Sequence, residues 1–125
     1  MEPIACPFCR PDPAAVVLRG EAGFVLKDKF PVTPGHLLIV PHRHIPSYFD
    51  ATPFEKTALW ALVERAKALM DAQGRPDGYN IGVNVGEAAG QTVGHLHIHL
   101  IPRRKGDTAD PRGGVRNVIP GKGGY

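Results

Sequence analysis

The chain has 125 residues, which is the size of one domain with a hydrophobic core of its own, and we expect residues 1–125 to form a single domain. Its 15 glycines and 13 prolines favour a loop-rich α+β or β-rich fold over a helical bundle. No apolar run approaches the roughly 20 residues of a membrane span, and the first residues lack a basic segment followed by an apolar one. We therefore expect no membrane association, no secretory leader and a cytoplasmic location.

The net charge of +3 is concentrated at the C-terminal end of the chain. Residues 103–125, a tail rich in glycine and proline, contain six basic and two acidic side chains. A basic segment of this kind can bind nucleic acid, but aromatic residues for base stacking are not interleaved with it. A small phosphate-rich ligand explains the same charge, so we expect no nucleic acid partner.

Strand-like segments alternate with turns along most of the chain. Each predicted strand is rich in β-branched or other apolar residues and is bounded by glycine or proline, and Pro102 is expected to end the last of them. The predicted strands are 14–19, 23–26, 36–40, 79–85 and 91–101.

One long helix is predicted between the third and fourth strands. Thr52 is a suitable N-cap, Pro53 suits the first helical position, and Glu55 completes a capping box with Thr52. Apolar residues then recur at helical spacing from Phe54 onward, and Gly74 follows the last of them.

Both cysteines lie in the segment Cys6-Pro7-Phe8-Cys9. In a chain expected to be cytoplasmic, this spacing indicates metal or redox chemistry and not a structural disulfide. A redox motif would follow a strand and precede a helix, whereas only a few residues come before this pair and prolines come after it. Metal binding is the better interpretation, and two cysteines supply half of a tetrahedral zinc site.

The six histidines fall into two short groups, and three of them alternate with apolar residues in the last predicted strand. Alternate positions on a strand share one face. The bare pattern fits an exposed polar face, a metal site, or an imidazole nucleophile that attacks phosphorus. Among the three alternating histidines, the central His97 is the natural nucleophile, but spacing alone does not choose between these alternatives. The two groups are His36, His42, His44 and His95, His97, His99.

The segment Gln91–Arg103 resembles the signature of the histidine triad (HIT) family, His-φ-His-φ-His-φ-φ, where φ is apolar. Residues 34–45 resemble the other histidine-bearing strand of that family, and Asn84 also matches. The resemblance extends from about residue 6 to residue 103, and 110–120 resembles a tail found in some bacterial members. It implies an α+β fold with an antiparallel sheet of about five strands, one long helix, and a homodimer.

The resemblance implies an enzyme that acts on a purine nucleotide conjugate, either a nucleoside phosphoramidate or a dinucleoside polyphosphate. By this pattern His97 attacks the α-phosphorus, a nucleotidyl-histidine forms, and water releases a nucleoside monophosphate, while His99 and His36 contact phosphate or leaving-group oxygens. A phosphorylase is the alternative within enzymes. A non-enzymatic, zinc-stabilised nucleotide-binding protein is the alternative outside them.

The family pattern also implies a set of substrate-binding positions. Gln91, Thr92 and Asn84 would bind phosphate, and Asp28 would hold the ribose hydroxyls. An apolar pocket for the base would be formed by Phe8, Leu26 and Phe30.

The family pattern assigns the cysteines to a structural zinc ion, with no organic cofactor. The implied ligands are Cys6, Cys9, His44 and His95, a donor set that suits a closed structural site. His95 would then be a zinc ligand that supports His97, and His42 is left over as an exposed residue.

Overall fold

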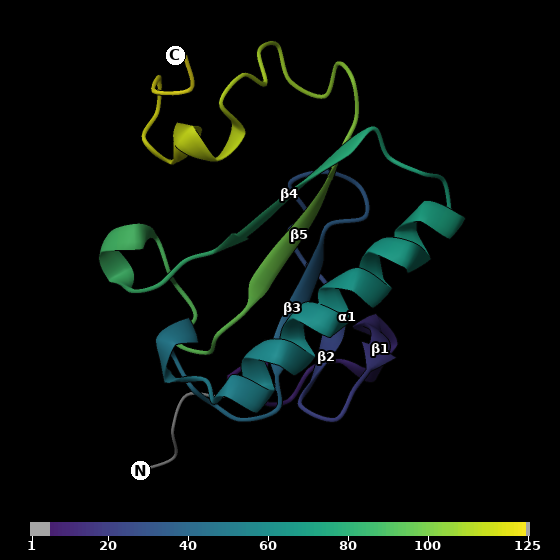
Figure 1. Ribbon diagram of the computed structural model, residues 1–125, viewed down its shortest axis with the longest axis vertical. Helices are drawn as coiled ribbons and strands as arrows, with labels where there is room; N and C mark the ends of the chain where they lie inside the picture. Colours follow the sequence, from purple (N-terminus) through teal and green to yellow (C-terminus); the bar gives the residue numbers. More distant parts are fainter. Residues whose placement is uncertain (1–5, 125) are drawn as a thin grey trace.

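The computed structural model describes residues 6–124, which contain a five-stranded antiparallel sheet with one long helix against one face (Figure 1). The spatial order of the strands is β1-β2-β3-β5-β4, so β1 and β4 are the edges. The predicted α+β class and the antiparallel sheet are thereby confirmed. The elements are β1 (Val16–Arg19), β2 (Gly23–Lys27), β3 (Leu37–Pro41), α1 (Pro53–Ala72), β4 (Gly78–Val83) and β5 (Ile98–Arg103), with short 3-10 helices at Pro13–Ala15, Tyr48–Asp50, Glu87–Ala89 and Gly114–Val118.

The capping box predicted for α1 is present. Thr52 Oγ1 accepts from the Glu55 amide at 3.1 Å, and Glu55 Oε1 accepts from the Thr52 amide at 2.9 Å. These bonds satisfy backbone donors that the first helical turn leaves without partners. At the other end, the Gln73 amide donates to the carbonyl of Met70.

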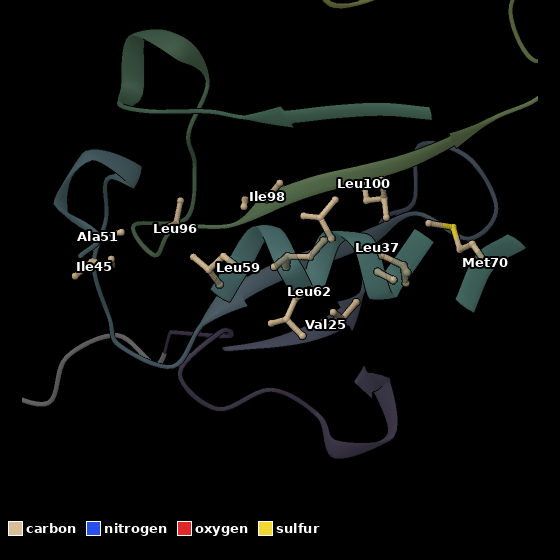
Figure 2. Close-up of a cluster of buried hydrophobic side chains, with 13 residues drawn as sticks. Val25, Leu37, Ile45, Ala51, Leu59, Leu62, Met70, Leu96, Ile98 and Leu100 are labelled. Carbon is tan, nitrogen blue, oxygen red and sulfur yellow. The ribbon is translucent and has the colours of Figure 1, made fainter. Parts of the chain in front are cut away.

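Side-chain alternation along the strands divides the buried residues between the two faces of the sheet. On β3, Leu37 and Ile39 pack toward α1, whereas Leu38 and Val40 pack on the opposite face. Figure 2 shows Leu59 and Leu62 of α1 among the buried side chains of the helix-covered face. We call the other face, which carries Leu38 and Val40, the site face.

The predicted apolar stripe of α1 is correct except at its start. Leu59, Val63 and Met70 are buried, but Phe54 is 57% exposed. At 100° per residue, Phe54 lies roughly 140° around the helix from the centre of the buried stripe, so its ring points away from the sheet. Trp60 is 39% exposed and donates from Nε1 to the Tyr48 hydroxyl at 3.2 Å.

The last strand differs from the prediction at both ends. It begins at Ile98 instead of 91, so only His99 of the three alternating histidines lies within it. Pro41 of β3 cannot donate a ladder hydrogen bond, and its carbonyl accepts from the His95 side chain, which prevents the ladder from continuing toward residue 91. Pro102 does not end the strand. It lies beyond the last pair with β3, where β5 has only β4 as a partner and proline is tolerated.

The segment after β5 lies at the end of the sheet remote from the start of α1 (Figure 1). It folds back on itself. Gly113 lies so close to Gly123 that a Cβ at Gly113 would collide with the Gly123 backbone, and Asn117 donates to the carbonyl of Arg112 at 3.3 Å. Its helical turn at Gly114–Val118 contacts β4 near Asn80. In the described part of the chain no helix is long and apolar enough to cross a membrane.

Candidate active site and metal centre

The two histidine-bearing segments lie side by side, although 50 residues separate them in the chain. The Leu96 amide donates to the carbonyl of Ile45 at 2.7 Å. The Gln91 side chain donates from Nε2 to the carbonyl of Pro46 at 2.8 Å and to that of Val93 at 3.0 Å. Its Oε1 accepts from the Gly86 amide at 2.9 Å. These bonds fix the irregular backbone before β5 and use the amide of Gln91, which the family pattern assigned to phosphate binding.

The orientation of His97 is set by the backbone two residues earlier. Its Nδ1 lies 2.9 Å from the carbonyl oxygen of His95. A carbonyl can only accept, so Nδ1 carries the proton and the neutral ring presents its lone pair at Nε2. The ring of Phe8 lies against this imidazole with a centroid separation of 4.9 Å, and that of His99 lies 5.0 Å away. A neutral imidazole held in this tautomer is suited to nucleophilic attack.

His99 and His36 form a hydrogen-bonded pair beside His97. The Val32 amide donates to Nδ1 of His36 at 3.1 Å, so the proton of the neutral His36 ring is on Nε2. That Nε2 lies 2.9 Å from Nδ1 of His99, which must accept, so Nε2 of His99 carries the outward-facing proton. Burial, and then repulsion from His97 and His36 when those rings are protonated, lower the pKa of His99 to about 4. His99 is therefore a neutral donor at neutral pH.

His36 lies behind His99 and has no free ring nitrogen. It is only 3% exposed, and its pKa is lowered, mainly by burial. The carboxylate of Asp28 lies 3.4 Å from Nε2 of His36 and also accepts from the Phe30 amide at 2.8 Å. In this arrangement His36 contacts His99. The role that the family pattern implies for His36 is different, namely contact with phosphate or leaving-group oxygens.

Four side chains from three distant parts of the chain converge on one point. Nδ1 of His44 lies 3.1 Å from Cys9 Sγ and 3.1 Å from Nδ1 of His95. Nδ1 of His95 in turn lies 3.4 Å from Cys6 Sγ and 3.5 Å from Cys9 Sγ. These separations are close to the edges of a tetrahedron around an ion with Zn–S of about 2.3 Å and Zn–N of about 2.0 Å. The cluster can hold a metal ion, and it contains all four residues predicted to bind zinc.

The hydrogen bonds around His95 fit a metal ligand. Its Nε2 lies 2.9 Å from the carbonyl of Pro41, so Nε2 carries the proton and Nδ1 presents a lone pair to the cluster. A second group, Asp28, His36 and His99, is also close enough for an ion. In that group, Nδ1 of His36 accepts a hydrogen bond from the Val32 amide and therefore carries no proton. A metal bound at Nε2 would then require a His36 ring without any N–H proton. The chemistry of the donors therefore favours the cysteine cluster.

The residues predicted to bind the base are not gathered into one pocket. Phe8 and Leu26 belong to the buried cluster on the site face, and each is less than 10% exposed. Phe30 is 79% exposed in the loop after β2 and is not part of that cluster. Asn84 follows β4, two residues after the Gly82 position that pairs with His99, and Thr92 is exposed in the segment before His95.

Two backbone contributors to the site, and one ion pair beside it, could not be found from side-chain patterns. The Val32 amide and the Pro41 carbonyl set the protons of His36 and His95 through the backbone. Arg43, between two histidines of the second group, pairs with Glu55 on α1. A capping-box glutamate gives no indication that it also binds a distant arginine. His42 is exposed as predicted, and its Nε2 donates to the carbonyl of Gly20.

The fold and the paired histidine segments together define a histidine triad protein. The HIT domain family matches residues 10–106 of the chain. The chain belongs to the HIT family. The resemblance noted in the sequence is thereby confirmed. Cys6 and Cys9 precede the matched residues, and their closeness in the structure fits the CxxC pair near the N-terminus.

Several curated relatives of the chain are named for reactions of dinucleotides. It is 38% identical to "AP-4-A phosphorylase" of Mycobacterium tuberculosis over 93 residues, which are 74% of this chain and 48% of that protein. It is 41% identical to "Bis(5'-adenosyl)-triphosphatase" of Dictyostelium discoideum over 87 residues, which are 70% of this chain and 58% of that protein. The chain spans about half the length of the curated relatives it matches.

Solved structures share the fold over most of the chain. A Zn-bound histidine triad family protein from Mycobacterium smegmatis superposes with a TM-score of 0.76 at 34% identity, covering 85% of this chain and 80% of that one. A HIT family protein from Bacillus anthracis gives 0.75 at 34% identity, covering 82% and 75%.

Proposed function

We propose that this protein hydrolyses nucleotide conjugates through a covalent intermediate on His97. The observation that carries the proposal is the hydrogen bond from His97 Nδ1 to the His95 carbonyl, which leaves Nε2 as the nucleophilic atom. In the first step a bond forms between Nε2 and the α-phosphorus, and the bond from phosphorus to the leaving group breaks. In the second step water attacks the same phosphorus, the N–P bond breaks, and a nucleoside monophosphate is released.

In this proposal the neighbouring histidines stabilise and orient. The Nε2 proton of His99 is donated to a phosphoryl oxygen, where negative charge increases during attack. His36 holds His99 in the tautomer that makes this possible. Thr92 and Asn84 add polar groups around the phosphate, and Gln91 acts on the same region by fixing the backbone.

The names of the relatives support a dinucleoside polyphosphate as the substrate class. A nucleoside phosphoramidate has the same reacting phosphorus and differs in its leaving group. The nucleotide would place its ribose toward Asp28 and its base near Phe8 and Leu26, and Phe30 would contact the base only if its exposed loop moved toward them. Water is proposed as the acceptor, and phosphate in its place would make the protein a phosphorylase.

A zinc ion at Cys6, Cys9, His44 and His95 completes the proposal. When bound, the ion would supply a structural cross-link and no reacting group, because the four protein donors fill a tetrahedral coordination shell. The cysteine segment would then be tied to His95, whose carbonyl orients His97. Thiolate ligands persist in a reducing compartment, which supports a cytoplasmic location.

We further propose a homodimer formed along β4. This strand is an edge of the sheet, and its Ile81 is 43% exposed. Unpaired strand edges with exposed apolar side chains favour pairing with another chain. Light scattering of the purified protein would show a mass twice that of the 13.5 kDa chain, and a monomeric mass would contradict the dimer.

The activity is tested with diadenosine triphosphate, diadenosine tetraphosphate and adenosine phosphoramidate, separately in water and with added phosphate. Acid quenching followed by mass spectrometry of peptides should find a nucleotidyl group on His97. His97→Ala should abolish turnover but retain nucleotide binding, whereas His42→Ala, on an exposed residue outside the site, should behave like the wild type. ADP formed only with phosphate would indicate a phosphorylase. Binding without turnover of any substrate would instead support the non-enzymatic alternative.

A further inference from the structure

Arg43 connects the segment that carries His44 to the first turn of α1. It lies between His42 and His44, just after β3. Its Nε donates to Glu55 Oε2 at 3.0 Å, and its Nη2 donates to Glu55 Oε1 at 2.7 Å. Two parallel bonds of this kind fix the direction of a guanidinium group as well as its distance from the carboxylate.

The partner in this pair is already immobile without Arg43. Glu55 is only 8% exposed, and its carboxylate and amide both bond to Thr52 in the capping box. The bond from Arg43 lowers the pKa of Glu55 to about 2, so the carboxylate is ionised at neutral pH. The helix cap requires only Thr52 and Glu55. The contact with Arg43 is therefore additional to capping, and its other end is the segment that bears His44.

His44 itself is exposed, and its ring contacts Cys9 and His95 of the cysteine cluster. Its position depends on the backbone that carries it. The Ile45 amide donates to the Arg43 carbonyl at 3.0 Å in a tight turn around His44, and the Ile45 carbonyl accepts from Leu96 at 2.7 Å. The Arg43 side chain ties the same turn to α1 through its two bonds to Glu55.

We propose that Arg43 and Glu55 are a positioning pair for the metal ligand His44 and that they raise the zinc affinity of the cluster. This inference rests on the zinc site proposed above. An exposed histidine on an unrestrained turn would lose conformational freedom on binding the ion, and a turn already fixed to α1 loses less. Neither residue touches the metal position, so both act through the placement of His44. Groups that hydrogen-bond a metal ligand directly contribute about 10-fold to 100-fold to metal affinity, and a pair that acts through the ligand's backbone should contribute at most the lower figure.

The test measures zinc affinity on the full chain at a temperature where the metal-free protein is folded. Arg43→Gln removes both donors, and Arg43→Lys keeps the charge but loses the paired geometry. Glu55→Gln removes the charge but preserves a capping box, since glutamine serves at that position. Arg75→Gln, on an exposed arginine beyond α1, is the matched control for loss of one positive charge. Competition with a coloured chelator gives each dissociation constant, and elemental analysis gives the zinc content.

We expect one zinc per wild-type chain and an unchanged affinity in Arg75→Gln. Arg43→Gln and Glu55→Gln should each weaken zinc binding by up to about 10-fold, with Arg43→Lys in between. The double variant should be no weaker than Arg43→Gln, because both changes remove the contact with Glu55 and Arg43→Gln also removes the longer bond to the Asp50 carbonyl at 3.4 Å. Cobalt-substituted single variants should keep the absorption of a tetrahedral Cys₂His₂ site. Wild-type affinity in both single variants, or additive losses, would overturn the pairing. Absence of zinc from the wild type would instead overturn the metal site itself.

Discussion

Nε2 of His36 donates to Nδ1 of His99 across 2.9 Å, and this bond determines which nitrogen of His99 faces outward. The amide of Val32 occupies the other nitrogen of His36, so a backbone group fixes the protons of both rings in sequence. A histidine that must donate to a phosphoryl oxygen requires such control, because a neutral imidazole has two tautomers and only one of them has the proton in place.

Replacement of His36 should therefore reduce turnover through His99. We expect His36→Ala to lower kcat by up to about 100-fold, since His99 would populate the other tautomer and shift from its position. His99→Ala should cost about 100-fold to 1,000-fold, the usual loss for one donor to a developing oxyanion. Steady-state kinetics of the two variants and the double variant provides the check. Because both changes act on one donor, the double variant should match His99→Ala, and additive losses would contradict the coupling.

The lowered pKa of His99 predicts a pH dependence of stability. In the folded protein this pKa is about 4, below the ordinary value of 6.5. The unfolded chain therefore binds the proton first as pH falls, so the free energy of unfolding contributed by His99 is fully present above about pH 6.5 and is lost between there and about pH 4. His99→Asn should show a shallower decline over this window.

Urea unfolding of wild type and His99→Asn at several pH values measures this difference. The metal ligands also take up protons in this range, so both proteins are compared with zinc saturated and only the difference in slope is interpreted. Parallel slopes for the two proteins would mean that the folded His99 titrates like an unperturbed imidazole.

Removal of zinc should destabilise the protein and loosen the cysteine segment. An ion that binds only the folded state at about 1,000 times its dissociation constant contributes about 4 kcal/mol to the free energy of unfolding. A chelator should therefore lower the Tm of the wild type, and added zinc should restore it. Cys9→Ser loses a thiolate ligand and should start with the lower Tm. Differential scanning calorimetry measures each change, and an equal chelator effect on Cys9→Ser would show that the chelator acts elsewhere.

Much of the sheet and helix follows from local sequence signals. Thr52, Pro53 and Glu55 define the start of α1, and both of the helix-capping bonds that they imply are present. The prediction starts the last strand at residue 91 instead of Ile98, because the alternation of His95, His97 and His99 with apolar residues is identical to that of a strand. What ends the ladder is the chemistry of Pro41, on a different strand. Alternation in one segment carries no information about the strand that pairs with it, so the true start of β5 could be found only from the tertiary structure.

The candidate site shows the same division. The four zinc ligands predicted from the family pattern lie close together in the structure, as residues that bind one ion must. The role of His36 behind His99, and the engagement of Gln91 with the Pro46 carbonyl, depend on backbone groups that any residue could supply. Sequence identifies the side chains of such a site more readily than the carbonyls and amides that orient them.

Gly23 should be a position where even one added methyl group is destabilising. It begins β2 opposite Pro41, and a Cβ there would collide with the carbonyl oxygen of Val40 and lie 2.9 Å from Cδ2 of the buried Leu59. Because backbone and core would both have to shift, Gly23→Ala should lower the free energy of unfolding by about 1–3 kcal/mol, the usual cost of overpacking. Gly78→Ala is the matched control, since it also begins a strand but would place its Cβ in open space. Urea unfolding of both variants gives the comparison, and an equal stability for the two would show that β2 and α1 separate more easily than their packing indicates.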